Sequence, residues 1–341
     1  MPRAPSLPPV SIPARGPIRV LFSCVGRRVE LVRAFRAAGK RLGRRVETWG
    51  TDRTWLAPAM HQVDQAALLP NVTNRSYSAR LLDLVEKRRI HLLVPLIDSE
   101  LLLLARVRDR FLALGCLPLI SSPRVVGICR DKLLSYMHLK KHDVDTPKTL
   151  TFSDLRRWRR PRFPLYVKPR AGSAARGHYL CEDRKELNFY AQRVPDPIIQ
   201  EYVRGDEYSL DIYAGFDGRV RCVVPRLRLE VRGGEVSKGR TVKDRSIMAV
   251  GRRVVESLAG CIGVITIQCI RTPDRRIRVI EINPRFGGGN PLSIRAGADF
   301  PYWILRALCG REPAIRLDGF RDRLDMLRYD ESVFCPAPRR R

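Results

Sequence analysis

The sequence has 341 residues, 44% of them hydrophobic, which is enough for two or three domains with a substantial core. No apolar run approaches the length of a membrane span, and the proline-rich residues 1–16 lack the apolar segment of a secretory signal, so a disordered leader is expected there. The formal net charge of +29 is dispersed and mostly arginine, without a nucleic-acid motif. Compositional bias with affinity for a phosphorylated ligand is therefore favoured over dedicated nucleic-acid binding.

Residues 17–120 are predicted to form an open α/β domain with a parallel sheet. Ile18–Cys24 reads as a strand, and the helix that follows is expected to stop at Gly39. Further strands are predicted at 46–52 and 91–97, with a helix over 76–90 between them and Asp98 as the N-cap of a leucine-rich helix. Strand–helix–strand order with short connections indicates parallel βαβ units. Such sheets bind ligands at the carboxyl ends of their strands.

From residue 121 the pattern becomes α+β. Residues 163–180 read as two strands joined by a Gly/Ser/Ala-rich loop, which predicts a hairpin flap. Antiparallel strands are expected over 196–236, and a second hairpin over 263–285. We expect a small subdomain at 121–198, a large one at 199–335 and a loose basic tail at 336–341.

Nine cysteines are scattered singly, with no CxxC pair and no zinc-type spacing. This usage indicates reduced thiols in a cytoplasmic compartment. Cys261 and Cys269 lie in apolar stretches and are predicted to be small core residues.

The stretch "VIEINPRFGGGNPL" at 279–292 combines an apolar strand with polar groups at its end. Side chains two apart share a strand face, so Val279, Glu281 and Asn283 are expected to point one way and Ile280 and Ile282 the other. Oxygen ligands at a strand end suit Mg²⁺ bound to phosphates, which Arg285 could also reach. The glycines would let backbone approach the ligand. The alternative is a strand end with a plain turn and a surface salt bridge.

Three further polar positions fit a phosphate or nucleotide site. Lys168 ends a strand immediately before the flap, where a lysine and backbone N–H groups can hold phosphates. Glu201 could offer groups to an adenine edge, although an edge strand explains it equally well. Gln268 lies on the strand expected to pair with that of Glu281, so the two can face each other across the hairpin.

Taken in order, the segments resemble the ATP-grasp superfamily. The matching pieces include "FSCVGRRVELVRAF", "YVKPRAGSAARG", "IIQEYVRGDEYSLDI", "VPRLRLEVRGGEVSKGRTVKD" and "VIEINPRFGGGNPLSIRAGAD", and they extend from residue 20 to about 310. The chain looks most like short single-unit relatives of the carbamoyl-phosphate synthase large chain and like the ligase of pyrrolysine biosynthesis. Many family members carry an acid where this chain has Gln268, but carbamoyl-phosphate synthase-like members also have an amide there.

The resemblance implies a role for each matching residue. Gln268, Glu281 and Asn283 would bind Mg²⁺ or Mn²⁺. Arg285 would stabilise the transferred phosphoryl group. Candidates for the acyl phosphate or the substrate carboxylate are Arg226, Arg228 and Lys243. The implied ATP contacts are Lys132 and Lys168 at the phosphates, the 171–177 loop with Gly172, Ser173 and Gly177 closing over them, Glu201 and Val203 at the adenine, and Glu207 at the ribose.

The implied activity is that of an ATP- and Mg²⁺-dependent carboxylate–amine ligase. It would form an amide bond through an acyl phosphate, on a small amino-acid-like substrate. The alternatives are carboxyphosphate or carbamoyl-phosphate synthesis, and a non-catalytic protein that binds a nucleotide or polyanion. Dimers are common among the relatives, so a homodimer is an open expectation.

Overall fold

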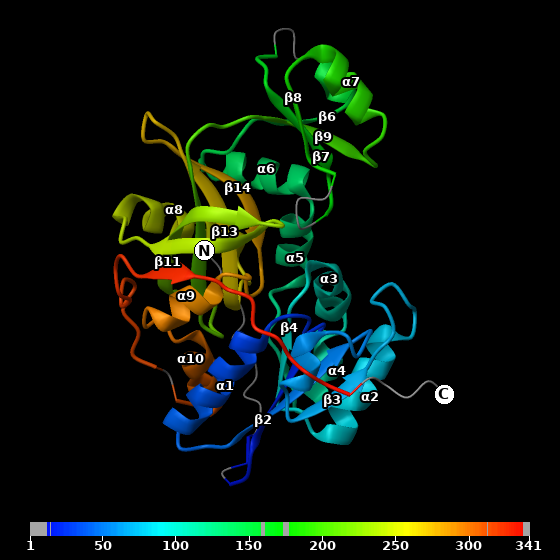
Figure 1. The fold of residues 1–341 in the computed structure, drawn as a ribbon, viewed down its shortest axis with the longest axis vertical. Coiled ribbons are helices and arrows are strands. Elements are labelled where there is room, and N and C mark those ends of the chain that lie inside the picture. The colour runs from blue at the N-terminus through cyan, green and yellow to red at the C-terminus, as the bar shows by residue number, and fades with distance from the viewer. Residues whose placement is uncertain (1–11, 14, 158–160, 173–176, 312, 337–341) are drawn as a thin grey trace. The chain divides into compact units, whose positions relative to one another are not determined.

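The computed structural model describes residues 12–13, 15–157, 161–172, 177–311 and 313–336. The described chain divides into two compact units, one formed by residues 121–298 and 315–326 and the other by residues 12–120, 299–314 and 327–336 (Figure 1). Within these described ranges, no helix has both the length and the apolar character needed to cross a bilayer.

The N-terminal unit is built on a five-stranded parallel sheet in the order β3-β2-β1-β4-β5. This confirms the predicted open parallel sheet. Its strands are β1 (Ile18–Ser23), β2 (Val46–Asp52), β3 (Gln65–Leu68), β4 (Leu92–Pro95) and β5 (Leu117–Pro118). Its helices are α1 (Val29–Arg41), η1 (Pro58–His61), α2 (Tyr77–Arg88), α3 (Asp98–Arg106), α4 (Arg108–Ala113) and α10 (Phe300–Leu308).

Two local predictions in this unit are wrong. Helix α1 continues through Gly39, which is buried where an added Cβ would lie 2.8 Å from the Arg44 carbonyl oxygen, so this glycine allows close packing and does not end the helix. Asp98 is the first residue of α3, and Ile97 occupies the cap position. The buried Glu100 carboxylate accepts from the backbone N–H groups of Leu96 and Ile97 and so satisfies the helix start.

The N-terminal unit also includes a segment from late in the chain. Helix α10 packs against α1, where Arg41 pairs with Asp299 and its guanidinium lies 5.6 Å from the centre of the Tyr302 ring. Part of the predicted leader is fixed here as well, because Arg44 Nη2 donates to the carbonyl oxygens of Pro13 and Gly16 at 2.9 Å. The rest of that leader, and tail residues 337–341, lie outside the described residues.

The second unit begins with helices α5 (Pro123–Arg130) and α6 (Lys132–Lys141) and a four-stranded antiparallel sheet in the order β6-β9-β7-β8. The strands are β6 (Thr149–Thr151), β7 (Leu165–Pro169), β8 (Tyr179–Cys181) and β9 (Pro197–Glu201), accompanied by η2 (Ser153–Arg157) and α7 (Arg184–Ala191). Leu165, Val167, Leu187 and Ile199 form its buried core. Strands β7 and β8 pair as the predicted hairpin that carries the flap.

The larger sheet of this unit has six strands in the order β14-β13-β10-β11-β12-β15. They are β10 (Asp206–Ala214), β11 (Val220–Arg232), β12 (Glu235–Thr241), β13 (Gly263–Arg271), β14 (Ile277–Asn283) and β15 (Asp325–Leu327). Helix α8 (Arg245–Leu258) covers the apolar face, closely enough that a Cβ on Gly251 would lie 2.6 Å from Leu210 Cδ2. Helix α9 (Asn290–Arg295) follows β14 through the glycine loop.

A β-bulge interrupts the hairpin of β13 and β14. Gln268 pairs with Glu281, but the next residue, Cys269, pairs with Val279, so Ile280 is the extra residue. Glu281 and Asn283 share a face as predicted. Val279 does not share it, because its partner Cys269 lies on the opposite face of β13 from Gln268; that part of the prediction is wrong. Cys261 and Cys269 are buried, as predicted.

Candidate active site

The face of the six-stranded sheet opposite α8 is polar. Strand alternation brings Ser209 and Asp211 of β10 to this face, and the register sets polar partners beside them on three neighbouring strands. The cross-strand pairs are Ser209 with Arg226 and Gln268, Asp211 with Thr266, Gln268 with Glu281, and Thr266 with Asn283. A polar surface of this extent on a central sheet is unusual unless it binds a ligand.

Asp211 is the buried centre of this face. Its carboxylate accepts from Arg226 Nε at 2.7 Å and Nη2 at 2.9 Å, from Ser293 Oγ of α9 at 2.6 Å and from Thr266 Oγ1 at 3.3 Å. Arg226 is only 1% exposed. Two of the three nitrogens of its guanidinium therefore bind Asp211 in the interior.

The loop after β14 lies directly on this network. Thr266 Oγ1 lies 3.2 Å from the carbonyl oxygen of Arg285, so its single proton is shared between this carbonyl and Asp211, and a Cβ on Gly287 would lie 2.8 Å from that hydroxyl. A Cβ on Gly289 would collide with Arg226 Nη1. The lack of a side chain at these two glycines thus allows the loop to approach the sheet. From the sequence, we expected it to allow the loop to approach a ligand. The loop holds the Arg285 guanidinium with its Nη2 3.5 Å from Asn283 Oδ1.

Arg228, Gln268 and Glu281 form a chain of hydrogen bonds across the polar face. We assign the Gln268 amide the orientation in which Nε2 donates to Glu281 Oε2 at 3.0 Å and Oε1 accepts from Arg228 Nη1 at 3.0 Å, because the reverse would set its oxygen against the carboxylate. Arg228 Nε also lies 3.4 Å from Glu207 Oε1. The pKa of Glu207 is raised, mainly by burial and further by the Glu281 charge, against the opposing effect of Arg228.

Two lysines from the smaller sheet and from α6 face the same region. Lys132 and Lys168 are buried; Lys168 Nζ donates to Gln200 Oε1 at 2.6 Å, and Lys132 Nζ to the Gly172 carbonyl oxygen at 3.1 Å. Burial and the charge of Lys132 lower the pKa of Lys168 to about 8, while Glu281 opposes the shift. Burial of the His178 ring and the charges of Lys168 and Lys132 lower the pKa of His178 to about 4. The site therefore concentrates positive charge that an anion would stabilise.

The other residues predicted to contact ATP are less closely grouped than the two lysines. The Glu201 carboxylate accepts from Arg278 Nη2 at 2.9 Å and from the Lys148 backbone N–H at 3.2 Å. Burial raises the pKa of this carboxyl, but these two bonds and the charges of Arg278 and Arg276 together lower it. Val203 is buried in the segment that follows β9. Gly177 has a positive φ at the end of the flap loop, and Gly172 lies at its start; Ser173 lies outside the described residues.

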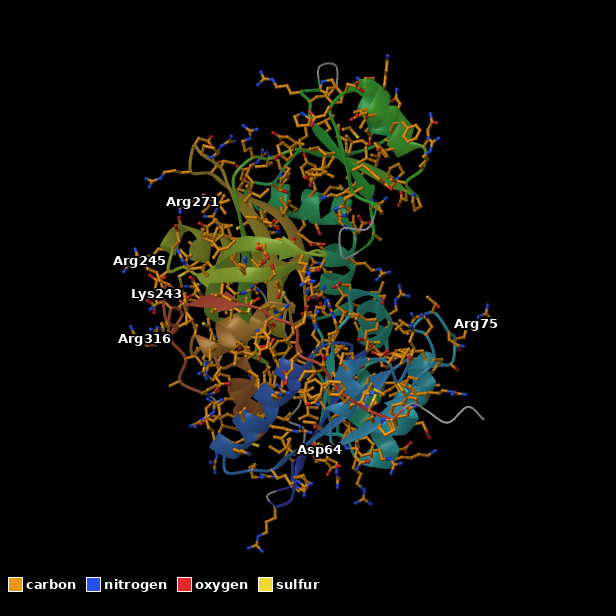
Figure 2. The ribbon with its side chains drawn as sticks, in the orientation of Figure 1. Asp64, Arg75, Lys243, Arg245, Arg271 and Arg316 are labelled. Carbon is orange, nitrogen blue, oxygen red and sulfur yellow. The ribbon has the colours of Figure 1, made fainter. Side chains whose placement is uncertain are left out.

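Lys243 stands apart from the polar face. Its side chain is exposed, with Nζ 5.3 Å from the centre of the Phe320 ring. Figure 2 labels Lys243, Arg245 and Arg271 along the same outer edge of this unit. The structure therefore does not bring Lys243 together with Glu281 and Asn283.

Sequence reasoning missed several residues of the site, among them Gln200, His178, Asp211 and Ser293. Two of them left a signal. Asp211 alternates with Ser209 in the apolar strand "YSLDIY", and Gln200 interrupts the apolar strand "PIIQE" at a position that is buried. A polar residue at an inward position predicts a buried hydrogen-bond network. Nothing in the local pattern marks Ser293 or His178.

The donor set on the hairpin fits a hard cation. Glu281 supplies a carboxylate, and Gln268 and Asn283 supply amide oxygens, which are ligands that Mg²⁺ accepts beside phosphates. In the described part of the chain, no three His, Cys, Asp or Glu side chains are grouped as they would be around a transition metal. The chemistry of the residues present thus matches magnesium held largely by a nucleotide.

Two protein families match this chain over adjoining segments. Residues 20–120 match the PylC-like N-terminal domain, and residues 129–289 match the ATP-grasp domain. Residues 129–289 are therefore an ATP-grasp domain. This chain places a PylC-like N-terminal domain before its ATP-grasp domain, and the predicted resemblance is confirmed.

Solved structures share the fold at low sequence identity. The biotin carboxylase domain of 2-oxoglutarate carboxylase from Hydrogenobacter thermophilus, in complex with MgADP, ADP and bicarbonate, is 18% identical with a TM-score of 0.72, covering 90% of this chain and 73% of that one. The L-amino acid ligase from Bacillus licheniformis is 18% identical with a TM-score of 0.67, over 87% and 75%. N5-carboxyaminoimidazole ribonucleotide synthetase from Thermotoga maritima is 18% identical with a TM-score of 0.62, over 89% and 78%.

One sequence relative is matched over a short segment. A D-alanine–D-alanine ligase from Fusobacterium nucleatum is 28% identical over 65 residues, which are 19% of this chain and 23% of that protein. This chain therefore matches less than a quarter of that relative's length.

Proposed function

We propose that this protein is an ATP- and Mg²⁺-dependent carboxylate–amine ligase that forms an amide bond through an acyl phosphate. The observation that carries the proposal is the convergence of two buried lysines with an acid and amides from a separate sheet. The depressed pKa of Lys168 arises from burial and from Lys132, and Glu281 opposes it, so all three charges act within one site. Two of the similar structures, a complex with MgADP and an L-amino acid ligase, support the same function.

Each group has a distinct task in this proposal. Lys132 and Lys168 neutralise the phosphates of ATP, and the flap between β7 and β8 covers them. Glu281, with Asn283 and Gln268, would hold Mg²⁺, which when bound neutralises charge on the phosphate oxygens. Arg285, held 3.5 Å from Asn283 Oδ1, faces the phosphoryl group in transfer. Arg226 acts indirectly, by fixing the sheet face through Asp211.

The chemistry requires two steps. A carboxylate oxygen of the first substrate attacks the γ-phosphorus of ATP, giving an acyl phosphate and ADP. The amine of the second substrate then attacks the carbonyl carbon, phosphate leaves with the electron pair of its C–O bond, and the amine nitrogen loses a proton. The protein contributes orientation and charge neutralisation, and exclusion of water protects the acyl phosphate from hydrolysis.

Isotope transfer provides the test. The protein is incubated with ATP, Mg²⁺ and pairs of amino acids, both of which carry ¹⁸O in their carboxylates. The proposal expects ADP release that depends on both members of a pair, and one ¹⁸O atom in each phosphate released. ADP release without ¹⁸O in the phosphate would exclude a carboxylate as the phosphoryl acceptor.

Two outcomes would favour the alternatives. ADP release that depends on bicarbonate and not on a labelled amino acid would indicate carboxyphosphate chemistry. Binding of ADP without turnover, across all pairs and with bicarbonate, would indicate a nucleotide-binding protein that does not catalyse.

A further inference from the structure

Arg228 lies on the polar face among the residues proposed to bind the metal, although a divalent cation would repel its positively charged guanidinium. Its side chain is 7% exposed and comes from β11, which is separated from the strand of Glu281, β14, by β10 and β13. It contacts Glu207 Oε1, Ser209 Oγ and the carbonyl oxygen of Gly234 at 3.3 to 3.5 Å. Its shortest contact is with Gln268, at 3.0 Å.

This contact engages the atom that a metal would need. Gln268 can bind a cation only through Oε1, because its Nε2 carries two hydrogens and no free lone pair. In the assigned orientation of the amide, Oε1 accepts from Arg228 and Nε2 donates to Glu281. A guanidinium and a divalent ion on the same oxygen would repel each other, so the two compete for it.

Resting on the proposed function, we propose that Arg228 is a positioning residue that holds Gln268 away from the metal until the metal–nucleotide complex binds. In the unliganded protein, Gln268 bridges Arg228 and Glu281 and fixes the carboxylate of Glu281. Binding of the metal turns the amide, so that Oε1 leaves Arg228. Glu207 and the Gly234 carbonyl retain the guanidinium on the face, and Glu207 balances its charge.

The arrangement has a consequence for affinity. The hydrogen bond from a charged donor to Gln268 must be broken on binding, so it lowers the apparent affinity for the metal–nucleotide complex. Loss of the Arg228 charge alone would also strengthen binding of a cation. A test must separate these two effects, and a double-mutant cycle does so.

The experiment is titration calorimetry of Mn²⁺–ADP into four proteins: wild type, Arg228→Met, Gln268→Met and the double variant. We expect Arg228→Met to tighten binding by about tenfold when Gln268 is present, because a hydrogen bond from a charged donor is released. In the Gln268→Met background the same change should tighten binding by about threefold or less, from charge alone. Arg221→Met is the matched control, since Arg221 is on the same strand and pairs with Asp217 at 2.8 Å.

The outcomes are distinguishable. Equal factors in the two backgrounds, or weaker binding by Arg228→Met, would overturn the proposal. Arg228→Lys, which keeps the charge, guards against misfolding of the methionine variant and should also tighten binding only when Gln268 is present. Failure of the wild type to bind Mn²⁺–ADP at all would instead refute the proposed function.

Discussion

Replacement of Lys168 by methionine should stabilise the unliganded protein while abolishing its response to nucleotide. The pKa of Lys168 is about 8 in the folded protein, against 10.5 for a free lysine, because of burial and the Lys132 charge. A difference of about 2.5 units at about 1.4 kcal/mol each makes the charged, buried form about 3 kcal/mol unfavourable below pH 8. Loss of the bond to Gln200 Oε1 offsets about 1–2 kcal/mol, so Lys168→Met should gain about 1–2 kcal/mol at pH 7.

The pH dependence of this gain follows from proton binding. Between pH 8 and 10.5 the folded state has released the Lys168 proton while the unfolded state still holds it, so the free energy of unfolding of the wild type rises with pH across this window. The advantage of Lys168→Met should therefore shrink from pH 8 and reverse by about pH 10. Urea unfolding from pH 7 to 10, with and without Mg²⁺–ADP, measures this. The reasoning would be refuted if the variant were less stable than the wild type at pH 7 without nucleotide. It would also be refuted if the difference in unfolding free energy between the two proteins did not change with pH.

Three further substitutions test other parts of the site. Glu281→Gln removes the carboxylate of the metal set and should weaken Mg²⁺–ADP binding about 10- to 100-fold by calorimetry; unchanged affinity would remove Glu281 from that role. Gly289→Ala should lower stability by about 1–3 kcal/mol, since its Cβ would lie 2.6 Å from a Val236 methyl, whereas Gly127→Ala in α5 meets nothing within 4 Å and should gain about 0.5–1 kcal/mol. Equal shifts in melting temperature for the two would contradict the packing argument. Asp211→Ala leaves the Arg226 charge buried and unpaired and should cost about 3–5 kcal/mol, partly recovered by adding Arg226→Met, with urea midpoints as the measure.

The sequence predicted the features that depend on local periodicity. The parallel sheet, the flap hairpin and the facing of Gln268 and Glu281 all follow from alternation and short connections, and the register bears them out. The resemblance to ATP-grasp proteins added roles that no spacing could supply. Those roles remain proposals.

The features that escaped prediction depend on contacts distant in sequence. The bulge at Ile280 shifts Val279 to the other face, and a single extra residue leaves no mark in an apolar strand. The Glu201 carboxylate appeared available for a nucleotide, but Arg278, on a strand of the other sheet, engages it. Gly39 resembled a helix stop because glycine is common there, yet close packing required it inside the helix.

The sharing of the Asp211 carboxylate links three elements of the fold. Arg226 of β11 and Ser293 of α9 donate to its two oxygen atoms, and the single hydroxyl proton of Thr266 of β13 is shared between Asp211 and the backbone of the loop that carries Arg285. Loss of Arg226 would leave the Asp211 charge unbalanced in the interior. Loss of Asp211 would leave the Arg226 charge unbalanced and the hydroxyls of Thr266 and Ser293 without this acceptor. Evolutionary change at these positions should therefore be concerted, and homologues that lack the acid should have lost the arginine too.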